Sequence, residues 1–340
     1  MKTQVCAVTV AYNNPKELKN LLSSLEQQNH SLSGLIVVDN SDDPYLAKNK
    51  EVFNRYSKKY NQASYHKTEK NIGSAGGFRL AMQAAHDNCF DWIWLLDQDG
   101  AVSPGCLAEL LKHAQDGDIL VPKMIDINQP DNSQPWAACR NFLGRKYPIA
   151  SASNCQIHAF GTHAVLISKK VLDTIGYYDD AIFFVGYEDN DYGYRAVQAG
   201  FVIFFVAGAE ARHPCKKPTG KKLKILPAQF LKILPADMDY LTHLPLVEKP
   251  CSRTEIRSIA PYSLAYLQSK YLQPWQFAVS LVFAECYALY RKVAGERRIA
   301  LMKTLRLYCV CLACSVKHDW PYDTIELLCQ ELLRAHPGRG

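Results

Sequence analysis

The 340-residue chain lacks several features that would place it in a special class of protein. No uncharged apolar run reaches the roughly 18 residues that a membrane-spanning helix needs. The nearest segment, residues 277–290, is shorter and is interrupted by Glu285. The first residues show no basic stretch followed by an apolar run and a small-residue cleavage site, so we expect no signal peptide. Internal repeats and low-complexity tracts are also absent, which argues against a solenoid or a fibrous protein.

The charge and cysteine content also exclude some classes. The net charge of +6 is too mild to indicate a nucleic-acid partner, although it fits a phosphorylated substrate or a membrane surface. Twelve cysteines in a chain without an export signal indicate reduced thiols in the cytoplasm, not a disulfide framework. The tightest group is Cys309, Cys311 and Cys314. It has no second pair at zinc-ligand spacing, and its apolar neighbours indicate a buried helix.

Residues 4 to about 125 alternate between strand and helix patterns. Short apolar runs predict strands at 5–11, 35–39, 63–68 and 91–97, and helical patterns follow three of them at 18–25, 73–85 and 107–111. Such crossover units predict an α/β fold with a mostly parallel sheet and helices on both faces. After an irregular stretch over 126–155, we expect strands at 160–168, 178–184 and 201–206, with helices from Lys169 and over 188–198.

The character of the sequence changes after residue 215. A lysine-rich link covers 216–225, and residues 226–340 show helical periodicity. We therefore expect an α/β domain over 1–215, a basic linker over 216–225 and a small helical C-terminal domain over 226–340. Aromatic residues among lysines and arginines in this tail, such as Trp275 and Phe277, would suit the edge of a membrane. Packing on the first domain and a dimer contact are open alternatives.

Polar side chains stand where the predicted strands end. Asn13, Asp39 and Asp97 each follow or close a strand, and ligands of open α/β sheets bind at the carboxyl ends of strands. The sharpest group is Asp97-Gln98-Asp99. Residues two apart in an extended chain point to the same side, so both carboxylates could face one divalent cation. An ordinary turn is the alternative, because Asp and Gly are common in turns.

A glycine-rich segment at 71–77 opens a predicted helix. Gly73, Gly76 and Gly77 permit a positive φ or the close approach of a ligand to the backbone, and a helix N-terminus favours anions. The spacing matches neither the dinucleotide fingerprint nor the phosphate-loop lysine motif. A plain turn therefore stays open for this segment.

Three carboxylates, Glu188, Asp189 and Asp191, stand at the start of another predicted helix. They could cap the helix and stabilise its dipole, or one of them could act as a general base. Arg195 lies two turns after Glu188 on the same face, where it would hold the acidic pair or lie at the surface. His213 follows the last predicted strand, and it becomes a candidate ligand if it lies near the Asp97-Gln98-Asp99 triplet.

In this order, these pieces resemble the family 2 glycosyltransferases with the GT-A fold. The resemblance covers roughly residues 4–215. It rests on the segments 8–13, 36–41, 71–77, 97–99, 161–162 and 183–195, with Gly200 after the last. It is nearest to the rhamnosyltransferase-like and galactofuranosyltransferase-like branches, where an Asp-Gln-Asp or Asp-Asp-Asp triplet and an acidic helix start recur.

The resemblance implies a role for each matched residue. Asp39 would accept a hydrogen bond from the imide of uracil or thymine. Asp97 would contact ribose or metal, Asp99 would bind Mg²⁺ or Mn²⁺, and His213 would supply a later metal ligand. Asp189 is favoured as the catalytic base, with Glu188 as its rival. The rest of the nucleotide site would be formed by Thr9, Ala11, Tyr12, Asn13, Asn71, Gly73, Gly76 and Gly77.

The resemblance further implies an inverting, metal-dependent transfer of a sugar to a glycan or lipid-linked glycan in bacterial surface polysaccharide assembly. The favoured donors are dTDP-rhamnose and UDP-galactofuranose, with UDP-glucose and UDP-N-acetylhexosamine as alternatives. A nucleotide-sugar-binding module without catalysis also stays open. A nucleotidyltransferase would carry a glycine-rich loop with a basic residue after the first strand, where this chain has residues 11–15, Ala-Tyr-Asn-Asn-Pro.

The remaining expectations concern partners and location. We expect no nucleic-acid partner and a cytoplasmic protein. Contact with the inner face of the plasma membrane and assembly into a homo-oligomer both stay open.

Overall fold

The computed structural model describes residues 3–128, 153–157, 160–180, 185–186 and 188–214, and also the backbone of four short strands. The chain divides into two compact units. The first is Met1–Phe142, Lys146–Phe184 and Glu188–Lys217, and the second is Leu143–Arg145, Val185–Tyr187 and Pro218–Gly340. In the second unit, β12 (Lys222–Lys224) and β13 (His243–Pro245) pair antiparallel. Most of the predicted helical domain lies outside the described residues, as do Trp275, Phe277 and the cysteines at 309, 311 and 314, and the domain boundary at 215 stays a prediction.

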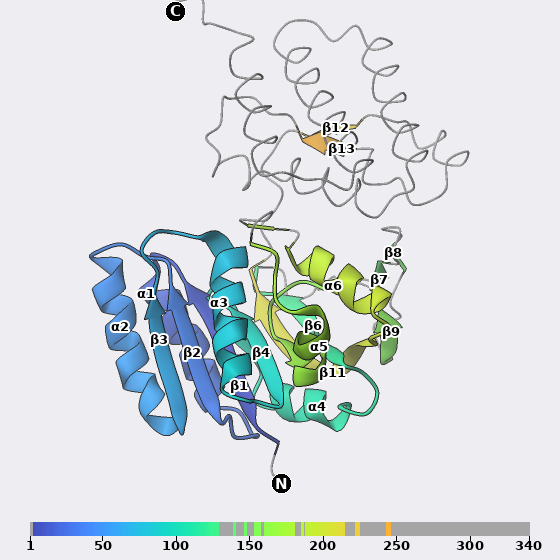
Figure 1. Ribbon diagram of the computed structural model, residues 1–340, viewed down its shortest axis with the longest axis horizontal. Coiled ribbons are helices and arrows are strands. Elements are labelled where there is room, and N and C mark those ends of the chain that lie inside the picture. The colour runs from blue at the N-terminus through green and yellow to red at the C-terminus, as the bar shows by residue number, and fades with distance from the viewer. Residues whose placement is uncertain are drawn as a thin grey trace, which may run out of the picture. The chain divides into compact units, whose positions relative to one another are not determined.

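The first unit alternates strands and helices (Figure 1). Its strands are β1 (Val5–Ala11), β2 (Gly34–Asp39), β3 (Gln62–Lys67), β4 (Trp92–Asp97), β5 (Ala101–Val102), β6 (Ile119–Asp126), β7 (Cys139–Arg140), β8 (Lys146–Tyr147), β9 (Cys155–Ile157), β10 (Val165–Ser168) and β11 (Ile203–His213). Its helices are α1 (Pro15–Glu26), α2 (Tyr45–Tyr56), α3 (Gly73–Asp87), α4 (Cys106–Lys112), α5 (Lys169–Ile175) and α6 (Glu188–Gln198), with a 3₁₀ turn at Ser57–Lys59. None of the helices in the described part is long and apolar enough to span a membrane.

The main sheet has the order β3-β2-β1-β4-β10-β6-β11-β5, with β9 paired to β11. Strands β1 to β4 are parallel to one another, and β6 is parallel to β11. Strand β10 runs antiparallel to both β4 and β6, and β5 runs antiparallel to β11. The predicted α/β fold is therefore confirmed. Because β1, β2, β4 and β11 point the same way, their carboxyl ends meet at one edge of the sheet.

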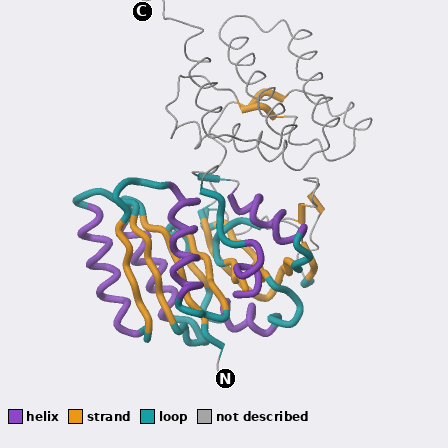
Figure 2. The backbone as a smooth tube through the Cα atoms, viewed as in Figure 1, coloured by secondary structure: helices purple, strands orange, loops and turns teal. Residues whose placement is uncertain are grey.

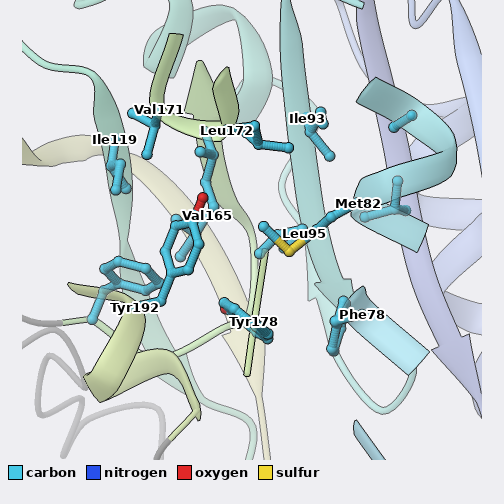
Figure 3. Close-up of a cluster of buried hydrophobic side chains, with 14 of the residues drawn as sticks. Phe78, Met82, Ile93, Leu95, Ile119, Val165, Val171, Leu172, Tyr178 and Tyr192 are labelled. Atoms are coloured by element: carbon cyan, nitrogen blue, oxygen red, sulfur yellow. The ribbon is translucent and has the colours of Figure 1, made fainter. Parts of the chain in front are cut away.

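Hydrophobic cores lie on both faces of this sheet, and Figure 2 shows the strands between helices. Side chains alternate across a strand, so Cys6 and Val8 of β1 enter one core while Val5 and Ala7 enter the other. Helices α3, α5 and α6 cover the first face, and α1, α2 and α4 cover the second. Figure 3 shows the first core, where α3 contributes Phe78 and Met82, β4 Ile93 and Leu95, and α6 Tyr192. Helices thus cover both faces of the sheet, and the polar residues that follow the strands lie at its carboxyl edge.

Three predicted strands differ from the structure. The strand expected at 160–168 begins only at Val165, because Ala164 has a φ of +58° that a strand cannot accommodate. Tyr178 lies in a loop, where its buried ring supplies the apolar signal that predicted a strand at 178–184. Residues 181–184 lie outside the described part. The strand expected at 201–206 continues to His213 as the long β11.

Packing explains two glycines in the segment 71–77. Gly73 has a φ of +76°, and its N–H donates to Oδ1 of Asn71, which is 2.9 Å away. A Cβ on Gly77 would lie 2.6 Å from Cγ1 of Val10, and one on Gly76 would lie 3.0 Å from the side chain of Ile72. Gly76 and Gly77 therefore let the first turn of α3 lie directly against Ile72 and β1, and close approach of a ligand is not needed to explain them.

We expect Gly77→Ala to lower the free energy of unfolding by about 1–3 kcal/mol, because the added methyl group has no space beside Val10. Urea denaturation measures this change. Gly105→Ala is the matched control, since a Cβ there meets nothing within 4 Å. Equal losses in the two variants would contradict the close-packing explanation.

Candidate active site

The three predicted metal ligands meet at the carboxyl edge of the sheet. Asp97 ends β4, Asp99 follows in the turn to β5, and His213 ends β11. Nε2 of His213 lies 2.9 Å from Oδ1 of Asp99 and 3.5 Å from Oδ2 of Asp97. One ligand atom from each of the three lies within 4.8 Å of the others. His213 therefore lies near the Asp97-Gln98-Asp99 triplet, which was the requirement for counting it as a candidate ligand.

The pairing of β5 with β11 produces this proximity. Ala101 of β5 lies opposite Arg212 of β11, so the turn just before β5 lies beside His213. In the sheet, β4 and β11 are separated by two other strands, β10 and β6. The short return strand β5 thus places the turn that carries Asp99 beside the end of β11.

The electrostatics of this cluster favour positive charge. Nδ1 of His213 donates to the carbonyl of Pro214 at 3.1 Å, which leaves Nε2 facing the carboxylates. Burial lowers the pKa of His213, but hydrogen bonds to Asp97 and Asp99 and their charges outweigh burial and raise that pKa to about 10. Two carboxylates and one imidazole are a donor set that suits Mn²⁺ and can also bind Mg²⁺. The residues therefore fit a divalent cation, whose positive charge would replace that of the second proton on the His213 ring.

The middle residue of the triplet ties β4 to β1. Gln98 Oε1 accepts from the backbone N–H of Tyr12 at 2.7 Å, and Gln98 Nε2 donates to the carbonyl of Tyr12 at 2.9 Å. The ring of Tyr12 is exposed, whereas Thr9 and Ala11 are buried in the sheet. Of the residues in and just after β1 that are predicted to line a nucleotide pocket, Tyr12 and the half-buried Asn13 therefore offer the more accessible surface.

Asp39 lies in a buried polar network at the end of β2. Its Oδ1 accepts from the backbone N–H of Ser41 at 2.8 Å. Its Oδ2 accepts from Asn49 Nδ2 at 3.0 Å and from the hydroxyl of Tyr65. The carboxylate is fully buried and joins α2 and β3 to the end of β2. Its predicted hydrogen bond to a base stays a prediction, and the structure adds this anchoring role.

Two of the three acidic residues of α6, Glu188 and Asp189, have pKa values that the charge of Asp97 raises. Glu188 is buried and accepts from the hydroxyl of Ser74 through Oε1, while its Oε2 has no hydrogen-bond partner among the described residues. Asp189 is half-buried, and its Oδ1 accepts from the backbone N–H and Nδ2 of Asn190, both at 2.7 Å. Burial, followed by the charge of Asp189, raises the pKa of Glu188. Burial also raises the pKa of Asp189, to a smaller extent, and the charge of Asp97 acts in the same direction on both.

The third acidic residue has a structural partner. Nε of Arg195 lies 2.8 Å from Oδ2 of Asp191, whose side chain is fully buried. The other guanidinium nitrogens donate to the carbonyls of Ile175 at 2.7 Å and Tyr177 at 2.8 Å. The interpretation that Arg195 holds Glu188 and Asp189 is therefore wrong. The residue holds Asp191 and fixes α6 to the end of α5 and the loop that follows it.

His163 is a further polar residue of the site that the sequence motifs did not indicate. This residue lies in the turn before β10, is fully buried, and hydrogen-bonds to the backbone at both ends of the turn that carries Asp97 and Asp99. A signal was present in the sequence, because a histidine inside an apolar segment needs partners for both ring nitrogens.

Comparisons with known proteins agree with this geometry. The family model described as "Glycosyl transferase family 2" matches residues 6–176. The chain is similar to galactofuranosyltransferase GlfT1 of Mycolicibacterium smegmatis, with 26% identity over 221 residues, which are 62% of this chain and 71% of the relative. It is also similar to galactofuranosyltransferase GlfT1 of Mycobacterium tuberculosis, with 33% identity over 138 residues. That match covers 38% of this chain and only 42% of the relative.

Two solved structures share the fold. One is S. aureus TarS 1-349 in complex with UDP, with a TM-score of 0.53 and 14% identity, covering 99% of this chain and 93% of that chain. The other is GalNAc-T7 with UDP, GalNAc and Mn²⁺, with a TM-score of 0.50 and 15% identity. This second likeness covers 63% of this chain and 44% of that chain, and at these identities both show the fold alone.

We expect Arg195→Met to lower the free energy of unfolding by about 3–5 kcal/mol, because it leaves the buried carboxylate of Asp191 without its cation. Urea denaturation at neutral pH measures the loss. Lys112→Met is the control, since its exposed ion pair with Glu109 should contribute only about 0–1 kcal/mol. A fully stable Arg195→Met variant would refute the structural role.

Proposed function

Because the chain belongs to glycosyl transferase family 2 and has the GT-A fold of these enzymes, we propose that this glycosyltransferase uses a nucleotide diphosphate sugar and a divalent cation in an inverting displacement. The observation that carries the proposal is the meeting of Asp97, Asp99 and His213 at the sheet edge, within electrostatic range of Glu188 and Asp189. That edge brings together a cation-binding donor set and a candidate base, which are the two functions that the reaction needs.

Asp97, Asp99 and His213 would hold the cation, which supplies positive charge to offset the charge that develops on the departing diphosphate. Gln98 keeps the end of β4 beside Tyr12 through its two hydrogen bonds. The accessible ring of Tyr12 offers a face on which a base can stack. The pyrimidine nucleotide would therefore lie over the ends of β1 and β2, with its diphosphate toward the three ligands.

Asp189 is the residue we assign as the base. Glu188 is buried, is held by Ser74 and keeps its proton to a higher pH, because the charge of Asp189 raises its pKa further. Asp189 is less buried and ionises first, so its carboxylate can accept the proton of an acceptor hydroxyl. A single displacement with one base inverts the anomeric configuration. Glu188 stays the alternative base.

The sugar and the acceptor are the finer part of the proposal. Galactofuranose from a UDP donor is favoured, because two similar proteins are named galactofuranosyltransferase. Rhamnose from a dTDP donor is the first alternative, and glucose and N-acetylhexosamine follow. The acceptor would be a glycan or lipid-linked glycan in surface polysaccharide assembly. A cytoplasmic location at or near the membrane surface also stays a prediction.

Asp99→Ala tests the cation site. We expect the unaltered protein to bind and slowly hydrolyse one UDP- or dTDP-sugar in the presence of Mn²⁺, and to lose this with a chelator. In the variant, binding should weaken by about tenfold or more, because one carboxylate ligand is gone. Calorimetry measures binding, and release of the free nucleotide diphosphate measures hydrolysis. Glu51→Ala, which removes an exposed carboxylate from α2, is the control and should behave like the unaltered protein.

Two outcomes would contradict this part of the proposal. A chain that binds no nucleotide sugar with Mn²⁺ present would not be a transferase of this kind. A chain that binds donor and metal but shows no turnover with any glycan acceptor would be a binding module.

Asp189→Asn tests the base. We expect kcat to fall by about 10²–10⁴ with donor binding retained, and Glu188→Gln to cost less. The base acts in its ionised form, so the rate should rise with pH through the raised pKa of Asp189 and level off above it. The acidic limb should therefore lie above about 3.9, the ordinary aspartate value. A larger loss in Glu188→Gln than in Asp189→Asn would reverse the assignment.

A further inference from the structure

His163 contacts the turn that carries two of the three cation ligands. Its Nδ1 accepts from the backbone N–H of Asp97 at 3.1 Å, and its Nε2 lies 3.2 Å from the carbonyl of Ala101. The N–H of Asp97 can only donate, so Nδ1 is the acceptor and the proton lies on Nε2, which donates to Ala101. Burial lowers the pKa of this histidine to about 4, in keeping with a neutral ring. One side chain thus joins the first and last residues of the turn 97–101.

The ring also lies directly against the backbone of the same turn. A Cβ on Gly100 would lie 2.1 Å from Cε1 of His163 and 2.4 Å from Nε2, so no side chain fits at this position while the ring is there. The ring centroid of His163 also lies 5.4 Å from that of His213. His163 therefore contacts the segment of both carboxylates and the ring of the imidazole ligand.

The backbone that carries His163 is itself fixed to β4. Ala164, the next residue, has a φ of +58°, a conformation that costs about 1–2 kcal/mol for a residue with a side chain. Its carbonyl accepts from the indole N–H of Trp94 at 2.9 Å, and Trp94 is part of β4. Strained residues persist where the surrounding structure fixes them, and they cluster at functional sites.

We propose that His163 is a positioning residue for the cation site. It fixes the turn 97–101 so that Asp97 and Asp99 present their carboxylates to the same point, and it packs against His213 so that Nε2 faces that point. The inference rests on the proposed function, because it takes these three residues as ligands. A purely structural histidine would stabilise the fold but would leave the cation affinity of the folded protein unchanged.

The test is Mn²⁺ binding, measured by the paramagnetic resonance signal of free Mn²⁺ at a temperature where circular dichroism shows each variant to be folded. We expect His163→Ala to weaken Mn²⁺ binding by about 10–100-fold. His163→Asn should recover part of the affinity, because its side-chain oxygen can accept from Asp97 as Nδ1 does. His113→Ala is the matched control, since both ring nitrogens of that histidine also have hydrogen-bond partners, here the side chains of Asp116 and Asn154, but it lies away from the ligands.

A double-mutant cycle tests the contact with Gly100. Gly100→Ala should weaken Mn²⁺ binding in the unaltered protein, because its methyl group displaces the ring of His163. In the His163→Ala background the ring is absent, so Gly100→Ala should change the affinity little. The loss of Mn²⁺ affinity in the double variant should therefore be clearly smaller than the sum of the losses in the two single variants. This result is expected for side chains that act through one contact.

The outcomes separate this inference from the proposed function. If Asp99→Ala loses Mn²⁺ but folded His163→Ala binds it as the unaltered protein does, the positioning role is overturned and the cation site stands. If the unaltered protein binds no Mn²⁺, both are overturned. If His163→Ala fails to fold, His163→Asn and Gly100→Ala decide, and normal Mn²⁺ affinity in a folded Gly100→Ala variant overturns the inference.

Discussion

The pairing of the two-residue strand β5 with the end of β11 is the contact on which the candidate site depends. In the sheet, two strands, β10 and β6, lie between β4 and β11, yet Asp97 and His213 at their ends lie only 3.5 Å apart. The chain leaves β4, turns at Gly100 and returns along β11, and this path brings Asp99 to within 2.9 Å of His213. Gly100 makes the turn compatible with the buried ring of His163.

The first turn of α3 connects the end of β2 to the start of α6. Asn40, at the end of β2, donates to the carbonyl of Gly73 at 2.9 Å, while the next residue, Ser74, hydrogen-bonds to Glu188 of α6. Gly77 lets this helix lie against β1, so its position is determined by the sheet. The region expected to hold the nucleotide and the helix that carries the candidate base therefore share one support.

The sequence predicted the parts of this fold whose signal is local. The apolar runs of β1, β2 and β4 and the polar residues after them are sufficient to place Asp97 and Asp99 at a sheet edge. Long-range contacts were not predictable in the same way. The ion pair of Arg195 with Asp191 is local, because the two residues are four apart on α6. Nothing near Arg195 in the sequence shows, however, that its other partners are the carbonyls of Ile175 and Tyr177. Likewise, nothing near His163 shows that it binds a turn more than sixty residues away. The sequence could not show that Gly76 and Gly77 pack closely against Ile72 and Val10, because close packing and close approach of a ligand require the same residue.

Four carboxyl groups near one edge of a sheet are unfavourable unless positive charge offsets them. In the protein alone, part of the offset is the proton that Asp97 and Asp99 favour on His213, and part is the retention of protons by Glu188 and Asp189. The charge of Asp97 raises the pKa of Asp189, so a cation held by the three ligands would lower that pKa. The same binding event would offset charge on the leaving group and ionise the base. On the proposed function, cation binding and activation of the base would therefore be coupled through Asp97, and the geometry of one turn would affect both.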